Sequence, residues 1–223
     1  MSVLKPGLIV SLTPSPQSPW QSPDDIARLA VAAAEGGAVA VKVDGPEAVR
    51  AVKALTAGLT VLAVNIDDTL GVASRITPTT DHARALVEAG ADVVELEADA
   101  AKRRTDGQDL SVLIAEFAAL GKPVKAGVGN AADAKTAVQA GAVYVSSSTS
   151  GYTPDVARMK LPDIDLVRSL VAAVPAPVIA ERGYANPDDV RAALDAGAMA
   201  VVVGSAIVDP VWLTRRFAQA TLS

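Results

Sequence analysis

The stretch "VEAGADVVELEAD", residues 87–99, decides the fold of this chain. Its first part brings an apolar-periodic helix to a glycine, Gly90, and a left-handed glycine is a common way for a helix to end. Its second part is a valine-rich run of the kind that forms a strand. The stretch therefore predicts a helix that is followed almost at once by a strand.

The same pattern occurs three more times, as "AEGGAV" (34–39), "VQAGAV" (138–143) and "LDAGAM" (194–199). Four further β-rich runs lie between these repeats, namely "GLIVSL", "TVLAVNI", "PVKAGVG" and "PVIAERG". Helices are expected to begin near "SPDD", "TPTTD" and "NPDD", which carry N-cap residues and prolines. Eight alternating units with continuous apolar strands indicate a parallel sheet covered by helices. The regular repeat favours a single-domain, closed (β/α)8 TIM barrel over residues 1–223, rather than an open doubly wound sheet.

Composition excludes several classes of function. The 223 residues contain no cysteine, so disulfides, thiolate metal sites and a cysteine nucleophile are excluded. A net charge of −5 without a basic stripe argues against nucleic-acid binding. The N-terminal apolar run, residues 7–12, is too short for a signal peptide or a membrane span, so we expect a cytoplasmic protein with no membrane partner. The single histidine, His82, is expected at the surface, and we predict neither a metal nor a cofactor.

Chemistry in such barrels lies at the C-terminal ends of the strands and in the loops that follow them. Polar residues stand at most of these positions. Lys42, Glu95 and Lys125 are unusual among them, because apolar residues flank each one inside its strand. A buried charge is costly unless it is paired, so we expect each of the three to have a partner.

Four segments are candidates for contact with an anionic substrate. Barrels of this class often hold a phosphate with the loops after strands seven and eight, which here carry Gly183 in "ERGYAN" and Gly204 and Ser205 in "GSAI". The loop after strand six, "TSGYTPDVARMKLPD", is the one sizeable insertion on the catalytic face. Either its Tyr152 covers a ligand or the loop is a plain connection. The run "KRRTDG" (102–107) is interpreted as a solvated loop that could supply charge to an anionic substrate.

The chain resembles the N-acetylmannosamine-6-phosphate 2-epimerase family, bacterial enzymes of amino-sugar catabolism with a ribulose-phosphate-binding-type barrel. The likeness runs from "GLIVS" to "LTRRF" and is carried by "AAEGGAVAVKVDGPEAVRAVK", "ITPT", "ALVEAGAD", "TSGYTP", "PVIAE" and "VVVGSAI". The resemblance implies cofactor-free proton transfer at the carbon next to the sugar carbonyl. It places the family's strand-seven glutamate on Glu181. It also places the proton-transferring lysine of strand three on Ile66, or on Asn65, and this chain has no lysine between Lys53 and Lys102.

Other positions also depart from the family pattern. Its "EGR" after strand seven is "ERG" here, which moves the guanidinium to Arg182. The remaining departures are Thr13 for a glutamine, Lys42 for an arginine, Glu97 and Gly127 for two aspartates, and Asp209 for an arginine. If Glu97 and Gly127 face the barrel interior as in the family, so do Glu95 and Lys125, because alternate residues of a strand share a face. We therefore predict that Glu95 and Lys125 form an ion pair.

Three functions remain open. The first is an epimerase or isomerase acting on a phosphorylated amino sugar or a related carbonyl compound. Its catalytic set would be Glu181, Lys125, Lys42 and Glu97, with Lys125 or Lys42 as the base. Arg182, Gly183, Gly204, Ser205, Ser150, Tyr152 and Glu95 would form the substrate and phosphate site.

The second function is a lyase or aldolase-like enzyme that uses Lys125 as a Schiff base. The third is a non-catalytic relative that binds a small anion or a partner protein. The C-terminal segment "VWLTRRFAQATL" (211–222) is expected to form a helix that carries Trp212 and Phe217, either in the core, which we favour, or at a dimer contact. A homodimer is implied only by the resemblance.

Overall fold

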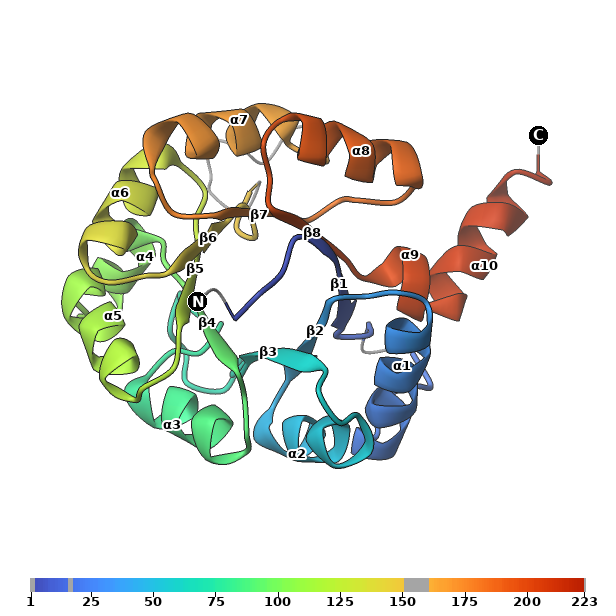
Figure 1. Cartoon of the computed structure of the whole chain (residues 1–223), viewed down its shortest axis with the longest axis horizontal. Helices are drawn as coiled ribbons and strands as arrows, with labels where there is room; N and C mark the ends of the chain where they lie inside the picture. The colour runs from blue at the N-terminus through green and yellow to red at the C-terminus, as the bar shows by residue number, and fades with distance from the viewer. Residues whose placement is uncertain (1–2, 16–17, 151–160, 223) are drawn as a thin grey trace.

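A computed structural model describes residues 3–15, 18–150 and 161–222. Eight parallel strands close into a barrel, and helices surround it (Figure 1). This confirms the predicted (β/α)8 barrel. The strands are β1 (Gly7–Leu12), β2 (Ala40–Asp44), β3 (Thr60–Val64), β4 (Val93–Glu97), β5 (Val124–Gly127), β6 (Tyr144–Ser146), β7 (Val178–Glu181) and β8 (Ala200–Val203).

Each strand pairs in parallel with its neighbours in sequence, and β8 returns to β1 with Ala200 opposite Gly7. The helices are α1 (Pro23–Glu35), α2 (Pro46–Leu55), α3 (Thr80–Glu88), α4 (Ala100–Thr105), α5 (Leu110–Ala119), α6 (Ala131–Gln139), α7 (Ile164–Ala173), α8 (Pro187–Asp195), α9 (Ser205–Val208) and α10 (Pro210–Gln219). One helix follows most strands, but α4 and α9 are additional short helices that precede α5 and α10 in the connections after β4 and β8. Both lie in loops at the C-terminal end of the barrel.

The repeat that predicted the fold has the expected backbone. Its four glycines follow helices α1, α3, α6 and α8 and have φ values of +91° to +111°, in the region that favours glycine: Gly37, Gly90, Gly141 and Gly197. The expected helix starts are also confirmed, because Ser22, Thr79 and Asn186 each accept a hydrogen bond from a backbone N–H of the first turn.

Apolar side chains fill the half of the barrel interior that lies toward the N-terminal ends of the strands, here called the lower half. The N-terminal segment of the chain closes this end. Leu4 is buried beside Ile9, Leu62 and Ile179, and Tyr144 lies fully buried among them. The Tyr144 hydroxyl accepts hydrogen bonds from the N–H groups of Val3 and Leu4, both at 3.0 Å. A second and larger apolar cluster fills the layer between the strands and the helices.

Two expectations about the outer segments are wrong. The run "KRRTDG" is not a solvated loop, because most of it forms α4 and Arg103 is fully buried. The C-terminal helix does not join the core: none of the α10 residues is buried, Phe217 is 73% exposed, and Figure 1 shows α10 projecting outward from the barrel. Among the described residues, no helix is long and apolar enough to cross a membrane.

Candidate active site

A pocket of about 470 Å³ opens at the C-terminal ends of the strands. Seven of the residues predicted for the site line it: Lys42, Glu97, Glu181, Arg182, Gly183, Gly204 and Ser205. Lys125 and Glu95 are instead buried, each with a side chain that is 0% exposed. Tyr152 lies outside the described residues. Most of the residues predicted for the site therefore lie together at one pocket, and Lys42 and Glu181 of its lining also belong to a charged layer that extends beneath it.

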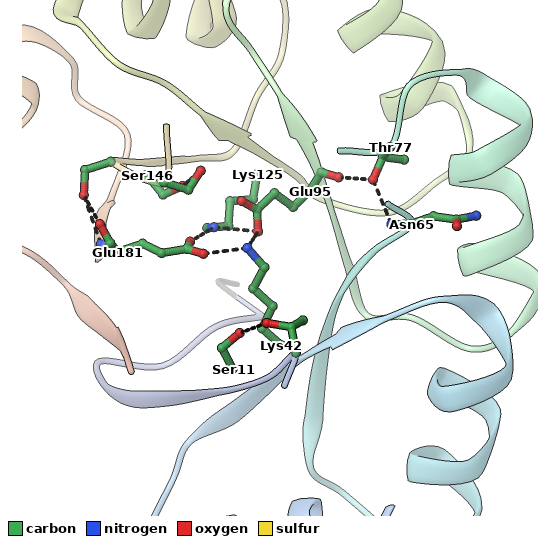
Figure 2. A network of polar contacts seen from close by, with 11 residues as sticks. Ser11, Lys42, Asn65, Thr77, Glu95, Lys125, Ser146 and Glu181 are labelled. Carbon is green, nitrogen blue, oxygen red and sulfur yellow. Dashed lines mark hydrogen bonds and ion pairs between the residues drawn. The ribbon is translucent and has the colours of Figure 1, made fainter. Parts of the chain in front are cut away.

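That charged layer is a ring of four side chains, Lys42, Glu95, Lys125 and Glu181, which come from β2, β4, β5 and β7 (Figure 2). Glu181 Oε1 lies 2.5 Å from Lys42 Nζ, and Glu181 Oε2 lies 2.6 Å from Lys125 Nζ. Glu95 Oε2 completes the ring at 2.7 Å from Lys125 and 2.8 Å from Lys42. The predicted Glu95–Lys125 pair is confirmed, as is the expectation that all three flanked charges have partners.

The ring is neutral and alternates in sign, which fixes the ionisation of its two members that line the pocket. Burial alone would lower the pKa of Lys42, but the carboxylates of Glu181 and Glu95 outweigh burial and raise it above the ordinary lysine value. Burial alone would raise the pKa of Glu181, but the ammonium groups of Lys125 and Lys42 outweigh it and hold the pKa at about 2. At neutral pH the pocket therefore presents a carboxylate and an ammonium in direct contact.

Neutral groups hold the ring members in place. Ser147 Oγ donates to the Glu181 carbonyl oxygen and accepts from the Glu181 N–H, both at 3.0 Å. Thr77 Oγ1 donates to the carbonyl oxygen of Glu95 at 2.6 Å and accepts from the Asn65 N–H at 3.2 Å, so the end of β3 is tied to β4 (Figure 2). The carboxylate of Glu95 has fewer partners, since its Oε1 is buried and has no hydrogen-bond partner among the described residues.

Gly127, at the end of β5, has no room for a larger residue. A Cβ on this residue would lie 2.1 Å from Ser148 Oγ, so the serine hydroxyl occupies the space that a side chain would need. Ser148 lines the pocket and accepts a hydrogen bond from Ser146 Oγ at 3.2 Å. The loop after β6 thus supplies a hydroxyl where the resemblance led us to look for a carboxylate on β5.

A second ion pair stands at the pocket wall. Lys102 Nζ, from α4, lies 2.5 Å from Glu97 Oε1, at the end of β4, and both residues line the pocket. The other Glu97 oxygen accepts the Arg75 N–H at 3.2 Å. Arg75 also lines the pocket, and its guanidinium pairs with Asp68. No sequence pattern indicated Arg75, and Lys102 was noted only as part of a charged run.

Buried Arg103 holds this wall together. Its guanidinium donates to the carbonyl oxygens of Glu97 at 2.8 Å and Pro78 at 2.9 Å, and to Gln108 Oε1 at 2.9 Å. Burial lowers the pKa of Arg103 to about 10, so the side chain is still charged at neutral pH. Through these bonds α4 is fastened to the segment after β3 that brings Ile76 to the pocket.

The loops after β7 and β8 form the opposite edge of the pocket. Gly183 has φ +84°, and a Cβ there would lie 2.5 Å from Leu161 Cβ, so the position requires glycine. Gly204, Ser205 and Arg182 complete this edge. Asp209 points elsewhere: it caps α10 by accepting the Trp212 N–H at 3.0 Å, a bond that lowers its pKa.

Neither Ser150, which was predicted for the site, nor His82, which was expected at the surface, lines this pocket. Ser150 is buried, and its hydroxyl donates to Asp163 Oδ2 at 2.9 Å instead of reaching the pocket. His82 bonds to Thr79 Oγ1 at 2.8 Å and to Asp67 Oδ2 at 3.2 Å. Within the described ranges no cluster of three or more histidine or acidic residues is arranged to hold a metal ion.

Known proteins are similar to this chain along nearly its whole length. The family model described as "Putative N-acetylmannosamine-6-phosphate epimerase" matches residues 26–223. A relative from Cutibacterium acnes, described as "Putative N-acetylmannosamine-6-phosphate 2-epimerase", is 37% identical over 217 residues, which are 96% of this chain and 93% of the relative. A relative from Clostridium perfringens (strain SM101 / Type A) with the same description is 31% identical over 220 residues and 97% of each chain.

Solved structures agree with the sequence matches. The N-acetylmannosamine-6-phosphate 2-epimerase from Clostridium perfringens superposes with a TM-score of 0.90 at 30% identity, covering 98% of this chain and 94% of that one. Thiamine phosphate pyrophosphorylase from Pyrococcus furiosus gives a TM-score of 0.58 at 19% identity, with 97% of both chains covered, and shares the fold alone.

Proposed function

This chain belongs to the N-acetylmannosamine-6-phosphate 2-epimerase family, and from that premise we propose that it inverts the carbon next to the carbonyl of a phosphorylated amino sugar by proton transfer. The observation that carries the proposal is the contact between Glu181 and Lys42 at the pocket floor, at 2.5 Å. The Glu181 carboxylate is ionised at neutral pH and is therefore able to accept a proton from the substrate carbon. The adjacent ammonium stabilises the negative charge that then develops on the carbonyl oxygen.

The pair works here without the strand-three lysine that the resemblance implies. Strand β3 reads "TVLAV" and contains no lysine, and Ile66, two residues beyond its end, presents an apolar side chain to the pocket. Lys42 remains protonated because its pKa is raised, so it acts as an acid or an electrostatic partner rather than as a base. Glu181 is then the group at the pocket floor that takes the proton. None of these steps needs a cofactor.

The charge of the pocket supports a phosphorylated substrate. Four cationic side chains line it (Lys42, Arg75, Lys102 and Arg182) against two acidic ones (Glu97 and Glu181). The backbone at Gly183, Gly204 and Ser205 is assigned to the phosphate, at the loops where barrels of this class often bind one. Asp209 does not oppose the phosphate, because its carboxylate is held by α10.

The lyase alternative is less well supported. A Schiff base at Lys125 requires a neutral amine that can reach a carbonyl carbon. Lys125 is instead 0% exposed and lies between two carboxylates at 2.6 and 2.7 Å. We therefore assign Lys125 and Glu95 to the support of Glu181 rather than to contact with the substrate.

The test is proton NMR of N-acetylmannosamine 6-phosphate in deuterated buffer with the wild-type protein. We expect the signal of the proton on carbon 2 to disappear while the C2 epimer appears. Glu181→Gln should slow both changes by roughly 100-fold or more, in line with the usual contribution of acid–base groups. Arg28→Met, on the exposed face of α1, is the matched control and should leave the rate unchanged.

Two results would reject this function. An unchanged carbon 2 signal at high protein concentration would exclude epimerisation of this substrate and would favour a non-catalytic anion-binding role. A covalent adduct trapped by borohydride, lost in Lys125→Met, would instead establish the lyase alternative.

We also infer a homodimer formed through α10. The helix projects from the barrel, and Phe217 at 73% and Leu222 at 84% exposure leave apolar surface open near the C-terminus. Burying such surface is favourable. Light scattering should report twice the mass of 22.6 kDa for the wild-type chain and less for Phe217→Ser; a monomeric wild type would reject the inference.

A further inference from the structure

Two ammonium–carboxylate pairs line the same pocket. Lys42 and Glu181 form one, and Lys102 and Glu97 form the other, each with an N–O distance of 2.5 Å. Glu181 ends β7 and Glu97 ends β4, and these strands are three places apart in the closed order of eight. The two pairs therefore stand on different sides of the barrel mouth, with the pocket between them.

The Lys102 pair is built as firmly as the first but is more open. The Lys102 side chain is 25% exposed, against 7% for Lys42, whereas Glu97 is only 6% exposed. Asp99 caps α4 by accepting the N–H groups of Ala101 and Lys102, and Arg103 ties the same helix to the backbone of Glu97. The ammonium is thus carried on a fixed helix at the edge of the pocket.

The two pairs are placed so that each can serve a different face of a substrate that lies between them. Inversion at carbon removes a proton from one face and delivers one to the other, and a single fixed carboxylate reaches one face only. On the β3 and β4 side of the pocket, Ile66 and Ile76 have no titratable atom. Lys102, paired with the Glu97 carboxylate, lies on this side, and its ammonium group carries exchangeable protons.

We propose that Lys102 is the second catalytic residue, which exchanges a proton with the substrate on the face opposite Glu181. The inference rests on the proposed function. In one direction the C–H bond breaks toward Glu181 and its electron pair passes to the carbonyl oxygen, which gives an enolate. The carbonyl then re-forms, and the electron pair of the enolate C=C bond takes a proton from Lys102, so that an N–H bond breaks as the new C–H bond forms. Glu181 ends protonated and Lys102 ends neutral; one proton then returns from Glu181 to Lys102 through solvent. The reverse reaction uses neutral Lys102 as the base.

The proposal predicts that the two half-reactions can be separated. Each C2 epimer of the 6-phosphate is incubated separately in deuterated buffer with wild type, Lys102→Met and Lys102→Arg. In both variants inversion should fall by at least about 100-fold. The epimer whose proton faces Glu181 should still exchange that proton for deuterium, while the other epimer should not. Glu181→Gln should show the opposite preference.

The arginine variant separates proton transfer from charge. Arginine keeps the positive charge and a partner for Glu97, but does not give up a proton near neutral pH. If Lys102→Arg inverts at the wild-type rate, Lys102 contributes charge only and the proposal is wrong. Loss of exchange with both epimers in both variants would assign Lys102 to substrate binding and would also overturn the proposal.

A matched control comes from the same helix. Arg104 lies on α4, is exposed and does not line the pocket, so Arg104→Met should retain inversion and exchange. The outcomes also distinguish this inference from the function on which it rests. A wild type that inverts and exchanges, with a fully active Lys102→Met, overturns the role of Lys102 alone. A wild type that does neither overturns both.

Discussion

The two halves of the barrel interior are filled by different kinds of side chain. The lower half is filled by Leu4, Ile9, Leu62 and Ile179, and its stability comes from apolar packing. The upper half, immediately above it, holds the ring of Lys42, Glu95, Lys125 and Glu181. The strand register places the two in contact, since Lys42 is opposite Leu62 and Lys125 is opposite Tyr144.

The difference shows what each half tolerates. Shortening a side chain in the apolar layer costs stability for two reasons: the contacts of the removed atoms are lost, and a cavity is left behind. A buried ring of charges is different, because every member depends on the opposite charge of its neighbours. Removing one member leaves the others uncompensated. The upper half is therefore the more fragile one, and it is also the half that meets the pocket.

The largest effect is expected from removing one charge of the ring. Lys125→Met leaves Glu95 and Glu181 with only Lys42 as a cationic partner, in a layer where Lys125 and Glu95 are 0% exposed. Breaking a buried pair in this way costs about 3–5 kcal/mol of unfolding free energy. Urea unfolding followed by circular dichroism measures it.

A second variant tests whether the loss comes from charge or from volume. Glu95→Gln combined with Lys125→Met restores a ring with one charge of each sign. The double variant should be more stable than the sum of the single losses predicts, by about 1–3 kcal/mol. Additive losses would show that the ring acts as packing, like the layer below it.

The next largest effect is the acid sensitivity that the ring confers. The pKa of Glu181 is about 2 in the folded protein and near 4.5 when unfolded, so the unfolded chain binds more protons between these values. The stabilisation is complete above pH 4.5 and is lost as the pH falls toward 2. It amounts to roughly 3 kcal/mol at 1.36 kcal/mol per pKa unit.

Urea unfolding of wild type and Glu181→Gln at pH 7, 4.5 and 3 isolates this contribution, because the other carboxylates are common to both proteins. The difference between the two stabilities should shrink as the pH falls. A constant difference would mean that Glu181 is not held ionised by the ring. At the alkaline end, the raised pKa of Lys42 implies stability that is present below pH 10.5 and is lost above it.

A smaller effect is expected in the lower half. Tyr144→Phe removes the hydroxyl that accepts the Val3 and Leu4 N–H groups but keeps the aromatic side chain in the core. Leaving buried donors unsatisfied costs about 1–3 kcal/mol. No charge changes, so the loss should be equal at pH 7 and pH 4.5. A loss that depended on pH would show that the two halves are coupled electrically.

Much of this architecture was predictable from the sequence. The helix-glycine-strand repeat gave eight units and closure, and Lys42, Glu95 and Lys125 were recognisable as charges within apolar strands. What could not be predicted depends on segments folding back over the barrel. A run such as "KRRTDG" shows charge but not which side chain turns inward, so buried Arg103 and pocket-lining Lys102 were missed. Likewise the apolar residues of α10 looked like core, although no strand lies beneath that helix in the described chain.

The smallest effect is expected where an ion pair lies outside the barrel. Arg28 contacts Asp25 at 3.2 Å on α1, with side chains 69% and 20% exposed. Water solvates both charges whether or not they are paired, so Arg28→Met should change the unfolding free energy by less than about 0.5 kcal/mol. Raising the salt concentration should reduce even this. If Arg28→Met costs as much as Lys125→Met, burial is not what makes the ring costly to break, and the contrast between the upper barrel and the rest of the molecule fails. If the two losses of unfolding free energy differ by several kcal/mol, an ion pair contributes more inside the barrel than on its surface. Solvent exclusion by the barrel then accounts for the difference.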